Sequence, residues 1–299
     1  MAPSAGTMKD LLSLGELCAL GSGLLWAVNS MMLRTRSHQV SPAAMNVIRC
    51  GSAAFFFWLW LPFSDPLAGL EQVTSGEWLL LIGSIVVGMV TGDTLYLTAI
   101  REIGLSRALA LSSTYPLTTL LFEWLLLNRP ASGGLALGCC LVALGVVLLS
   151  GQGKEPESRP VRLKYGVVLS LSAAVLWGLS TVMLYPAIAH LTLVQANSVR
   201  MPLVALVLYL IRLRSPAEFR RLDRRTLLVV AGSGLIGMGL SSLMYLASIK
   251  LIGATKAVTL TSVSPVFGMI LGVVFLKEKV GLRVLLGIAA CMGGVWLVL

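Results

Sequence analysis

Charged residues are scarce in this chain of 299 residues: Asp, Glu, Lys and Arg make up only 12% of it. A soluble domain normally carries about twice that share, so this composition argues against a water-soluble globular protein. Histidine is scarcer still, with only His38 and His190, and no HExxH pair exists to hold zinc as in a metalloprotease. The five cysteines form no CxxC pair, and we interpret them as packing residues. No metal site and no cofactor are expected.

Apolar residues fill the chain instead: 57% of the residues are hydrophobic and the mean hydropathy is +0.88. Runs of about twenty apolar residues, the length that crosses a bilayer as a helix, recur throughout. They predict an all-α integral membrane protein with ten transmembrane helices, at residues 14–33, 43–63, 78–99, 106–127, 133–149, 165–189, 194–211, 226–249, 255–276 and 283–299. The expected partners are the lipid bilayer and a small-molecule substrate. The net charge of +10 reflects basic loops, and no nucleic acid is expected.

The second half of the sequence repeats the first. Trp26, Asn46 and Arg49 recur 151 residues later as Trp177, Asn197 and Arg200. At an offset of 149, the pairs are Gly88/Gly237, Tyr96/Tyr245, Gly104/Gly253, Pro116/Pro265, Gly138/Gly287 and Gly145/Gly294. The offsets predict two five-helix repeats, residues 1–149 and 165–299, joined by a polar linker at 150–164. Because five is odd, the second copy must be inverted, and inverted repeats are typical of transporters with a substrate site between the halves.

Each half ends with small residues, a proline, an apolar stretch, a polar turn and a glycine-rich helix. The two copies read SSTYPLTTLLFEWLLLNRPASGGLALGCCLVALGVVLL and TSVSPVFGMILGVVFLKEKVGLRVLLGIAACMGGVWLVL. In this pattern, over nearly its whole length, the chain resembles the EamA family of the drug/metabolite transporter superfamily. The resemblance implies ten helices and secondary export of small metabolites or drugs. It also implies an acidic residue in the turn after the fourth helix of each half, which Glu278 matches and Arg129 does not.

Four ionisable residues lie inside the predicted spans: Arg49, Asp93, Glu123 and Arg200. A charge at the centre of a membrane helix costs about 2.5–3.5 kcal/mol on insertion scales, so each should face protein or water. Their depths predict two ion pairs, Arg49 with Asp93 toward one membrane face and Glu123 with Arg200 toward the other. One interpretation makes these pairs structural latches. In the other, the arginines line a central cavity and bind an anion, while an acid titrates and couples transport to protons.

The other candidate site residues are polar, aromatic or proline residues that recur in both halves. Asn46 and Asn197 lie three residues before the arginines, hence on the same helix face. The remaining candidates are Trp26, Trp177, Tyr96 and Tyr245 for the cavity wall, and Pro116 and Pro265 as hinges at kinks in the fourth helix of each half.

These features predict a secondary active transporter that exports small metabolites, such as amino acids or related organic anions and zwitterions, by alternating access. No ATP-binding motif is present, so the energy must come from a gradient or from exchange. An obligatory exchanger of phosphorylated or nucleotide-linked solutes is the first alternative. An intramembrane enzyme is another, but GMVTGD at 88–93 has Val90 where a GxGD protease motif needs glycine, so no enzyme is predicted. A membrane receptor or scaffold is a further alternative, but the sequence indicates no soluble domain or long tail for signalling.

Basic residues are distributed unevenly between the predicted loops. Loops 1–2, 3–4, 5–6, 7–8 and 9–10 hold seventeen of the twenty-three Lys and Arg residues. The opposite side holds four, namely Lys9, Arg129, Lys250 and Lys256. Short loops rich in Lys and Arg stay in the cytoplasm, so both termini are predicted on the non-cytoplasmic face of the cell membrane. The family resemblance implies the opposite orientation, with both termini in the cytoplasm.

Overall fold

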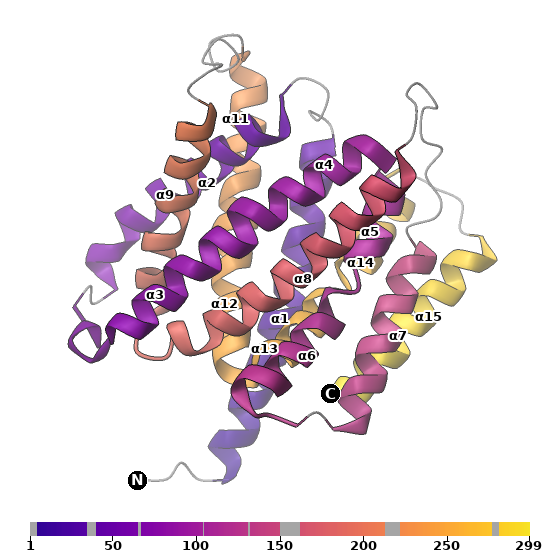
Figure 1. The fold of residues 1–299 in the computed structure, drawn as a ribbon, viewed down its shortest axis with the longest axis horizontal. Helices are drawn as coiled ribbons and strands as arrows, with labels where there is room; N and C mark the ends of the chain where they lie inside the picture. The colour runs from indigo at the N-terminus through magenta and orange to yellow at the C-terminus, as the bar shows by residue number, and fades with distance from the viewer. Residues whose placement is uncertain are drawn as a thin grey trace.

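The computed structural model describes residues 5–34, 40–64, 67–103, 105–130, 132–149, 162–212, 222–276 and 281–299. Every regular element in these ranges is helical (Figure 1). The first half contains α1 (Ala5–Arg34), α2 (Pro42–Trp60), η1 (Leu61–Phe63), η2 (Leu70–Gln72), α3 (Ser75–Ser84), η3 (Ile85–Gly92), α4 (Asp93–Ile103), α5 (Leu105–Ser112), α6 (Tyr115–Leu127) and α7 (Gly133–Leu149). The second contains α8 (Leu163–Ala187), α9 (Leu193–Arg212), α11 (Arg224–Gly234), η5 (Leu235–Leu240), α12 (Ser241–Ile252), α13 (Ala254–Thr261), α14 (Ser264–Leu276) and α15 (Leu282–Val298). Most of the predicted linker, and Glu278, lie outside the described residues.

Seven helical stretches of the described chain are long and apolar enough to cross a membrane. Three further apolar helices, α6, α7 and α15, are shorter. Large apolar side chains, among them Phe55, Trp58 and Trp296, are exposed on the outside of the bundle. An apolar exterior of this kind suits a hydrocarbon environment, and it confirms the prediction of an all-helical membrane protein.

The helix bounds repeat with the offsets seen in the sequence. A shift of 151 residues maps α2 onto α9 to within one residue, and a shift of 149 maps α5, α6 and α7 onto α13, α14 and α15. The helix starts are also capped alike. The Ser41 hydroxyl accepts from the Ala44 amide at the start of α2, and the equivalent Thr192 hydroxyl accepts from the Gln195 amide at the start of α9. The same local signals therefore set the same helix starts in both halves.

The third predicted span of each half is a continuous helix whose middle is π-helical. η3 joins α3 to α4, and η5 joins α11 to α12. The Asp93 amide donates to the Gly88 carbonyl and the Ser241 amide to the Ile236 carbonyl, five residues back in each case. An inserted π turn changes the direction of the side chains that follow, and such turns occur often at functional sites.

The two halves interleave, because the first helix of each half packs against the third span of the other. α8 packs on α3, η3 and α4, and α1 packs on α11, η5 and α12. Glycines in the π-helical segments permit this approach. A Cβ at Gly88 would collide with Ser180 on α8, and a Cβ at the equivalent Gly237 would collide with Asn29 on α1. Neither half forms a compact body without the other.

At the kink predicted in the fourth span of each half, the helix is interrupted rather than only bent. Two residues separate α5 from α6, and two separate α13 from α14. Pro116 and Pro265 are the second residues of α6 and α14. Proline has no N–H to donate and its ring collides with the preceding turn, so each helix stops and restarts at this point. The hinge role of these prolines stays a prediction.

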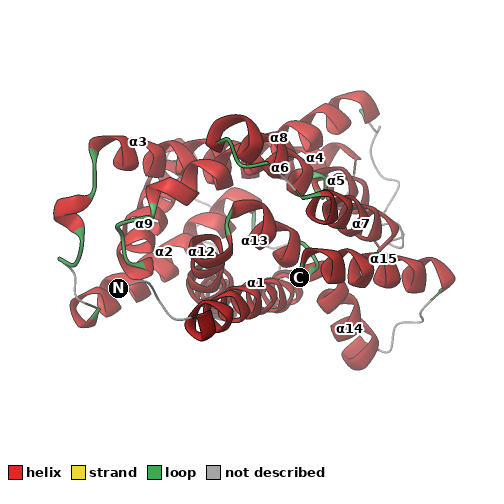
Figure 2. Ribbon diagram, turned by 90° about the horizontal axis from the view of Figure 1, so that it is seen from below, coloured by secondary structure: helices red, strands yellow, loops and turns green. Residues whose placement is uncertain are grey.

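α7 and α15 lie side by side at one edge of the bundle (Figures 1 and 2). Gly138 faces Gly294, and Gly145 faces Gly287. A Cβ at any of the four would lie 2.7–3.0 Å from a backbone oxygen of the opposite helix, at or below the closest approach that real Cβ atoms show. Because the lower-numbered glycine of α7 faces the higher-numbered one of α15, these equivalent helices are antiparallel.

Candidate functional site

A cavity of about 350 Å³ lies between the two halves, and both contribute to its wall. It is lined by nine of the residues that the sequence singled out: Trp26, Asn46, Arg49, Asp93, Tyr96, Trp177, Arg200, Tyr245 and Pro265. Three of the candidates, Asn197, Glu123 and Pro116, are not part of this lining. The volume suits a small metabolite.

Arg49 is buried in the wall of the cavity, with 6% of its surface exposed. Its Nη1 donates to Oδ1 of Asn46, one turn earlier on α2, at 2.9 Å. The guanidinium carbon lies 5.5 Å from the ring centre of Trp26 on α1, which gives a cation–π contact. In the described part of the chain, Nε and Nη2 of Arg49 have no hydrogen-bond partner. Unpaired donors on a buried guanidinium are costly, so a hydrogen-bond acceptor placed beside Arg49 would lower that cost.

Arg200 is held in the same way in the second half, and is 7% exposed. Its Nη1 donates to Oδ1 of Asn197 at 3.2 Å and to the Ser242 hydroxyl at 3.4 Å. The Ser242 hydroxyl itself donates to the same Asn197 oxygen at 2.8 Å. Asn197 is fully buried and therefore positions Arg200 from behind the cavity wall. Nε of Arg200 has no partner among the described residues.

Asp93 lies at the start of α4, directly after the π-helical segment. Its Oδ1 accepts from the indole N–H of Trp177, on α8 of the other half, at 2.9 Å. Among the described ion pairs, none within 4.0 Å joins Asp93 to Arg49. The two charges that the sequence paired therefore share one cavity without direct contact.

Aromatic rings form much of the remaining wall. Trp177 packs against Tyr96, with ring centres 5.1 Å apart, and against Tyr115 at 5.9 Å. The Tyr245 hydroxyl lies 3.0 Å from the Thr181 hydroxyl. Tyr115 was not predicted from the sequence, because Ser264 replaces it in the second half and the repeat gave no aromatic pair there. The one sequence feature that could have indicated Tyr115 as a cavity residue is its position directly before Pro116, at the helix break.

The predicted ion pair of Glu123 with Arg200 is wrong. Oε2 of Glu123 accepts from the amide of Thr255, the second residue of α13, at 2.9 Å. Its Oε1 lies 3.7 Å from Nη1 of Arg129. Arg129 in turn donates to the Tyr185 hydroxyl at 2.8 Å and stacks over that ring. The side chain of Glu123 points toward the amino terminus of α13, where a helix leaves backbone N–H groups free.

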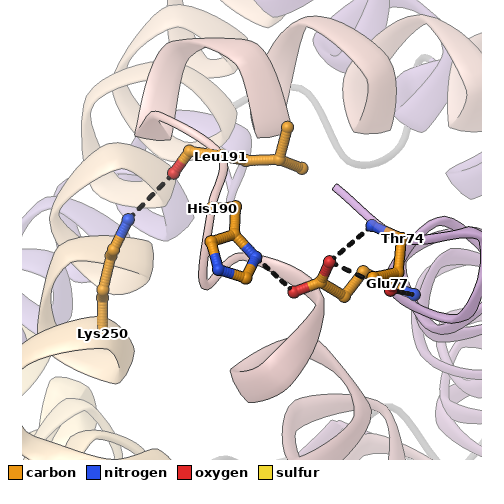
Figure 3. Close-up of polar contacts among 5 residues, drawn as sticks. All are labelled: Thr74, Glu77, His190, Leu191 and Lys250. Atoms are coloured by element: carbon orange, nitrogen blue, oxygen red, sulfur yellow. Dashed lines mark hydrogen bonds and ion pairs between the residues drawn. The ribbon is translucent and has the colours of Figure 1, made fainter. Parts of the chain in front are cut away.

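Further polar contacts gather at the same end of the molecule as Glu123. Oε1 of Glu77 on α3 lies 2.8 Å from Nδ1 of His190, and Oε2 accepts from the Thr74 amide at 2.7 Å (Figure 3). Nζ of Lys250 on α12 donates to the carbonyl of Leu191 at 3.0 Å. The turn between α8 and α9 is therefore fastened both to α3 and to α12.

Lys256 makes a further polar contact at this end of the molecule. Its ammonium forms an ion pair with Glu16, which joins α13 to α1. The elements fastened at this end come from both halves of the chain. The contacts therefore hold the two halves together where α6 ends and α13 begins.

Helices long and apolar enough to cross a membrane, two equivalent halves and a cavity between them define a polytopic membrane protein with room for a small ligand. The model of the EamA-like transporter family matches residues 13–151 and 164–299, one match in each half. The chain therefore belongs to the EamA-like transporter family, within the drug/metabolite transporter superfamily.

Known proteins resemble the chain over most of its length. A protein of Archaeoglobus fulgidus named "Uncharacterized transporter" is 28% identical over 278 residues, which cover 91% of this chain and 93% of the relative. A solved crystal structure superposes with a TM-score of 0.78 at 17% identity, over 95% of this chain and 96% of the other. At that identity, the second likeness shows the fold alone.

Replacing Glu123 by alanine should loosen the contact between α6 and α13. The Thr255 amide loses a charged acceptor, a bond worth about 1.5–3 kcal/mol, so local opening at the start of α13 should become roughly 10- to 100-fold more frequent. Hydrogen–deuterium exchange of peptides covering 254–261 measures this. Glu71→Ala, at an exposed carboxylate, is the control and should leave that exchange unchanged. Equal exchange in Glu123→Ala and wild type would contradict the assignment.

Proposed function

We propose that this chain is a secondary transporter that exports small metabolites bearing an anionic group, such as amino acids or related organic anions and zwitterions. One observation carries the proposal. Two buried arginines, one from each half, line the same cavity, and both have N–H donors without a partner in the described structure. Guanidinium groups bind carboxylates and phosphates in pairs of parallel hydrogen bonds, and the aromatic wall suits an apolar part of the solute.

The proposal includes ten membrane spans arranged as two inverted five-helix repeats. Equivalent helix bounds in the two halves and the antiparallel pairing of α7 with α15 support it. The contact between α2 and α9 agrees. The indole N–H of Trp58, near the end of α2, donates to the carbonyl of Ser198, near the start of α9, at 3.0 Å, as antiparallel equivalents require. Inverted repeats of this kind accompany a central site with access that alternates between two membrane faces.

An asymmetry between the halves supports alternating access. α6 packs against α13 at the end of the molecule where Glu123 lies. The equivalent pair, α14 and α5, makes no comparable contact in the described residues, and Figure 2 shows α14 well apart from α5. A carrier closed at one end and open at the other is expected to differ in this way between its repeats. We propose that the polar contacts around Glu123 close one entrance to the cavity.

An obligatory exchanger of phosphorylated or nucleotide-linked solutes is the second candidate. Phosphate oxygens would satisfy the free donors of Arg49 and Arg200 as well as a carboxylate does. A dependence of transport on solute in the opposite compartment separates the exchanger from an exporter. Asp93, the acidic residue of the described cavity lining, is the candidate for coupling to protons.

Alanine at Arg49 or Arg200 should impair transport more than it impairs folding. Loss of hydrogen bonds to a charged ligand costs about 1.5–3 kcal/mol, so kcat/KM should fall roughly 10- to 100-fold, with partial recovery by lysine. Counterflow in proteoliposomes over a panel of organic anions and zwitterions measures it. Arg225→Ala, at an exposed arginine, is the matched control. Wild-type transport in both cavity variants would leave the arginines as structural residues.

The charge distribution predicts the orientation in the cell membrane: the basic loops face the cytoplasm and both termini face the opposite side. In a variant without the five native cysteines, a membrane-impermeant thiol reagent should label Gln72→Cys in intact cells and spare Ser215→Cys until the cells are opened. Ser215 lies in a basic loop outside the described residues, and Gln72 is exposed in η2. Labelling of Ser215→Cys in intact cells would reverse the assignment.

A further inference from the structure

Asp93 and Ser242 occupy equivalent positions in the two halves, 149 residues apart. The Ser242 hydroxyl contacts Asn197 at 2.8 Å and Arg200 at 3.4 Å. An aspartate is longer than a serine, so from the equivalent backbone position its carboxylate can reach Arg49, the counterpart of Arg200. It does not do so in this structure.

Trp177 accounts for the difference. Its indole N–H comes from the other half of the chain and donates to Oδ1 of Asp93 at 2.9 Å. The Trp177 ring is itself fixed by Tyr96 and Tyr115. With the carboxylate held aside, Nε and Nη2 of Arg49 stay without a partner among the described residues. Trp177 is thus a positioning residue that keeps the Arg49 donors available.

A carrier that performs net transport has to reorient both with solute bound and with its cavity empty. An unpaired guanidinium is costly to enclose away from water, and pairing with an anion lowers that cost. When the cavity is loaded, the anionic solute of the proposed function supplies this partner. When the cavity is empty, the acidic residue of its described lining is Asp93.

We propose that Asp93 is an internal counter-anion for Arg49, held aside by Trp177 while a solute is bound and paired with Arg49 while the empty carrier reorients. This inference rests on the proposed function. Its consequence is net transport: a carrier that can neutralise its own empty site does not need a returning solute. Without Asp93, the same cavity moves solute only by exchange.

Binding to the purified protein tests the competition. Benzenesulfonate is a suitable probe because it stays charged across the working pH range, and benzenesulfonamide is its neutral counterpart. Trp177→Phe frees the carboxylate to occupy Arg49, so benzenesulfonate affinity should fall about ten-fold. Adding Asp93→Asn should restore it, and Asp93→Asn alone should bind at least as tightly as wild type. Trp58→Phe, a tryptophan outside the cavity lining, is the control.

The outcomes separate this inference from the proposed function. If wild type shows no preference for the sulfonate over the sulfonamide, the anion site itself is absent and both fail. If wild type binds the anion and Trp177→Phe is not rescued by Asp93→Asn, only the counter-anion role fails. A Trp177→Phe variant that does not fold leaves Asp93→Asn to decide, since weaker binding in that variant contradicts the competition.

Transport in proteoliposomes tests the consequence with ³⁵S-labelled benzenesulfonate. Wild type should show both net efflux into probe-free buffer and exchange against unlabelled probe. Asp93→Asn should keep exchange while net efflux falls at least about ten-fold, because the empty site must then reorient with its charge unpaired. Net efflux that falls only in proportion to exchange overturns the proposal. So does a wild type that exchanges without net efflux, or one that binds the probe and moves it in neither assay.

Discussion

The structure depends on a buried guanidinium held by an asparagine one helical turn away, an arrangement that occurs twice. A charged arginine costs free energy in an apolar bundle. Each asparagine accepts from only one nitrogen of its arginine, so part of the hydrogen-bonding capacity of the guanidinium is left over. Both arginines line a shared cavity between the halves, and each has at least one N–H donor without a partner among the described residues. The π-helical segments, the glycines that admit α1 and α8, and the helix breaks before the two prolines all lie around that cavity or support its wall.

The repeat accounts for the arrangement of the helices, and differences between its two copies account for the asymmetry between the halves. Carboxylates stand at Asp93 and Glu123, whereas the equivalent positions hold Ser242 and Gly272. Asp93 adds one acid to a cavity with two arginines, and Glu123 fastens α6 to α13 at one end. Through these contacts, Asp93 and Glu123 give the first half polar interactions that the equivalent positions of the second half cannot make in the same way.

The sequence predicted much of the fold because the signals are local or repeated. The offsets of 151 and 149 anticipated the equivalent helices, and the glycine-rich segment 133–149 coincides with α7. The hydrogen-bond partners of Glu123 and Asp93 were harder to predict, because depth in a span does not determine the direction of a side chain around the helix. A π-helical segment just before Asp93 changes that direction, and the partner of Glu123 is a backbone amide that no sequence pattern marks.

The central claim is that an anion completes the hydrogen bonding of Arg49 and Arg200. Its most direct test is an experimental structure determined with the transported solute from the counterflow panel bound. We predict a bound solute in the cavity whose acidic oxygens lie about 2.7–3.2 Å from the unpaired guanidinium nitrogens of Arg49 or Arg200. Asp93 should still accept the hydrogen bond from the indole N–H of Trp177. Solute bound elsewhere, with both guanidinium groups contacting only their present protein partners, would contradict it.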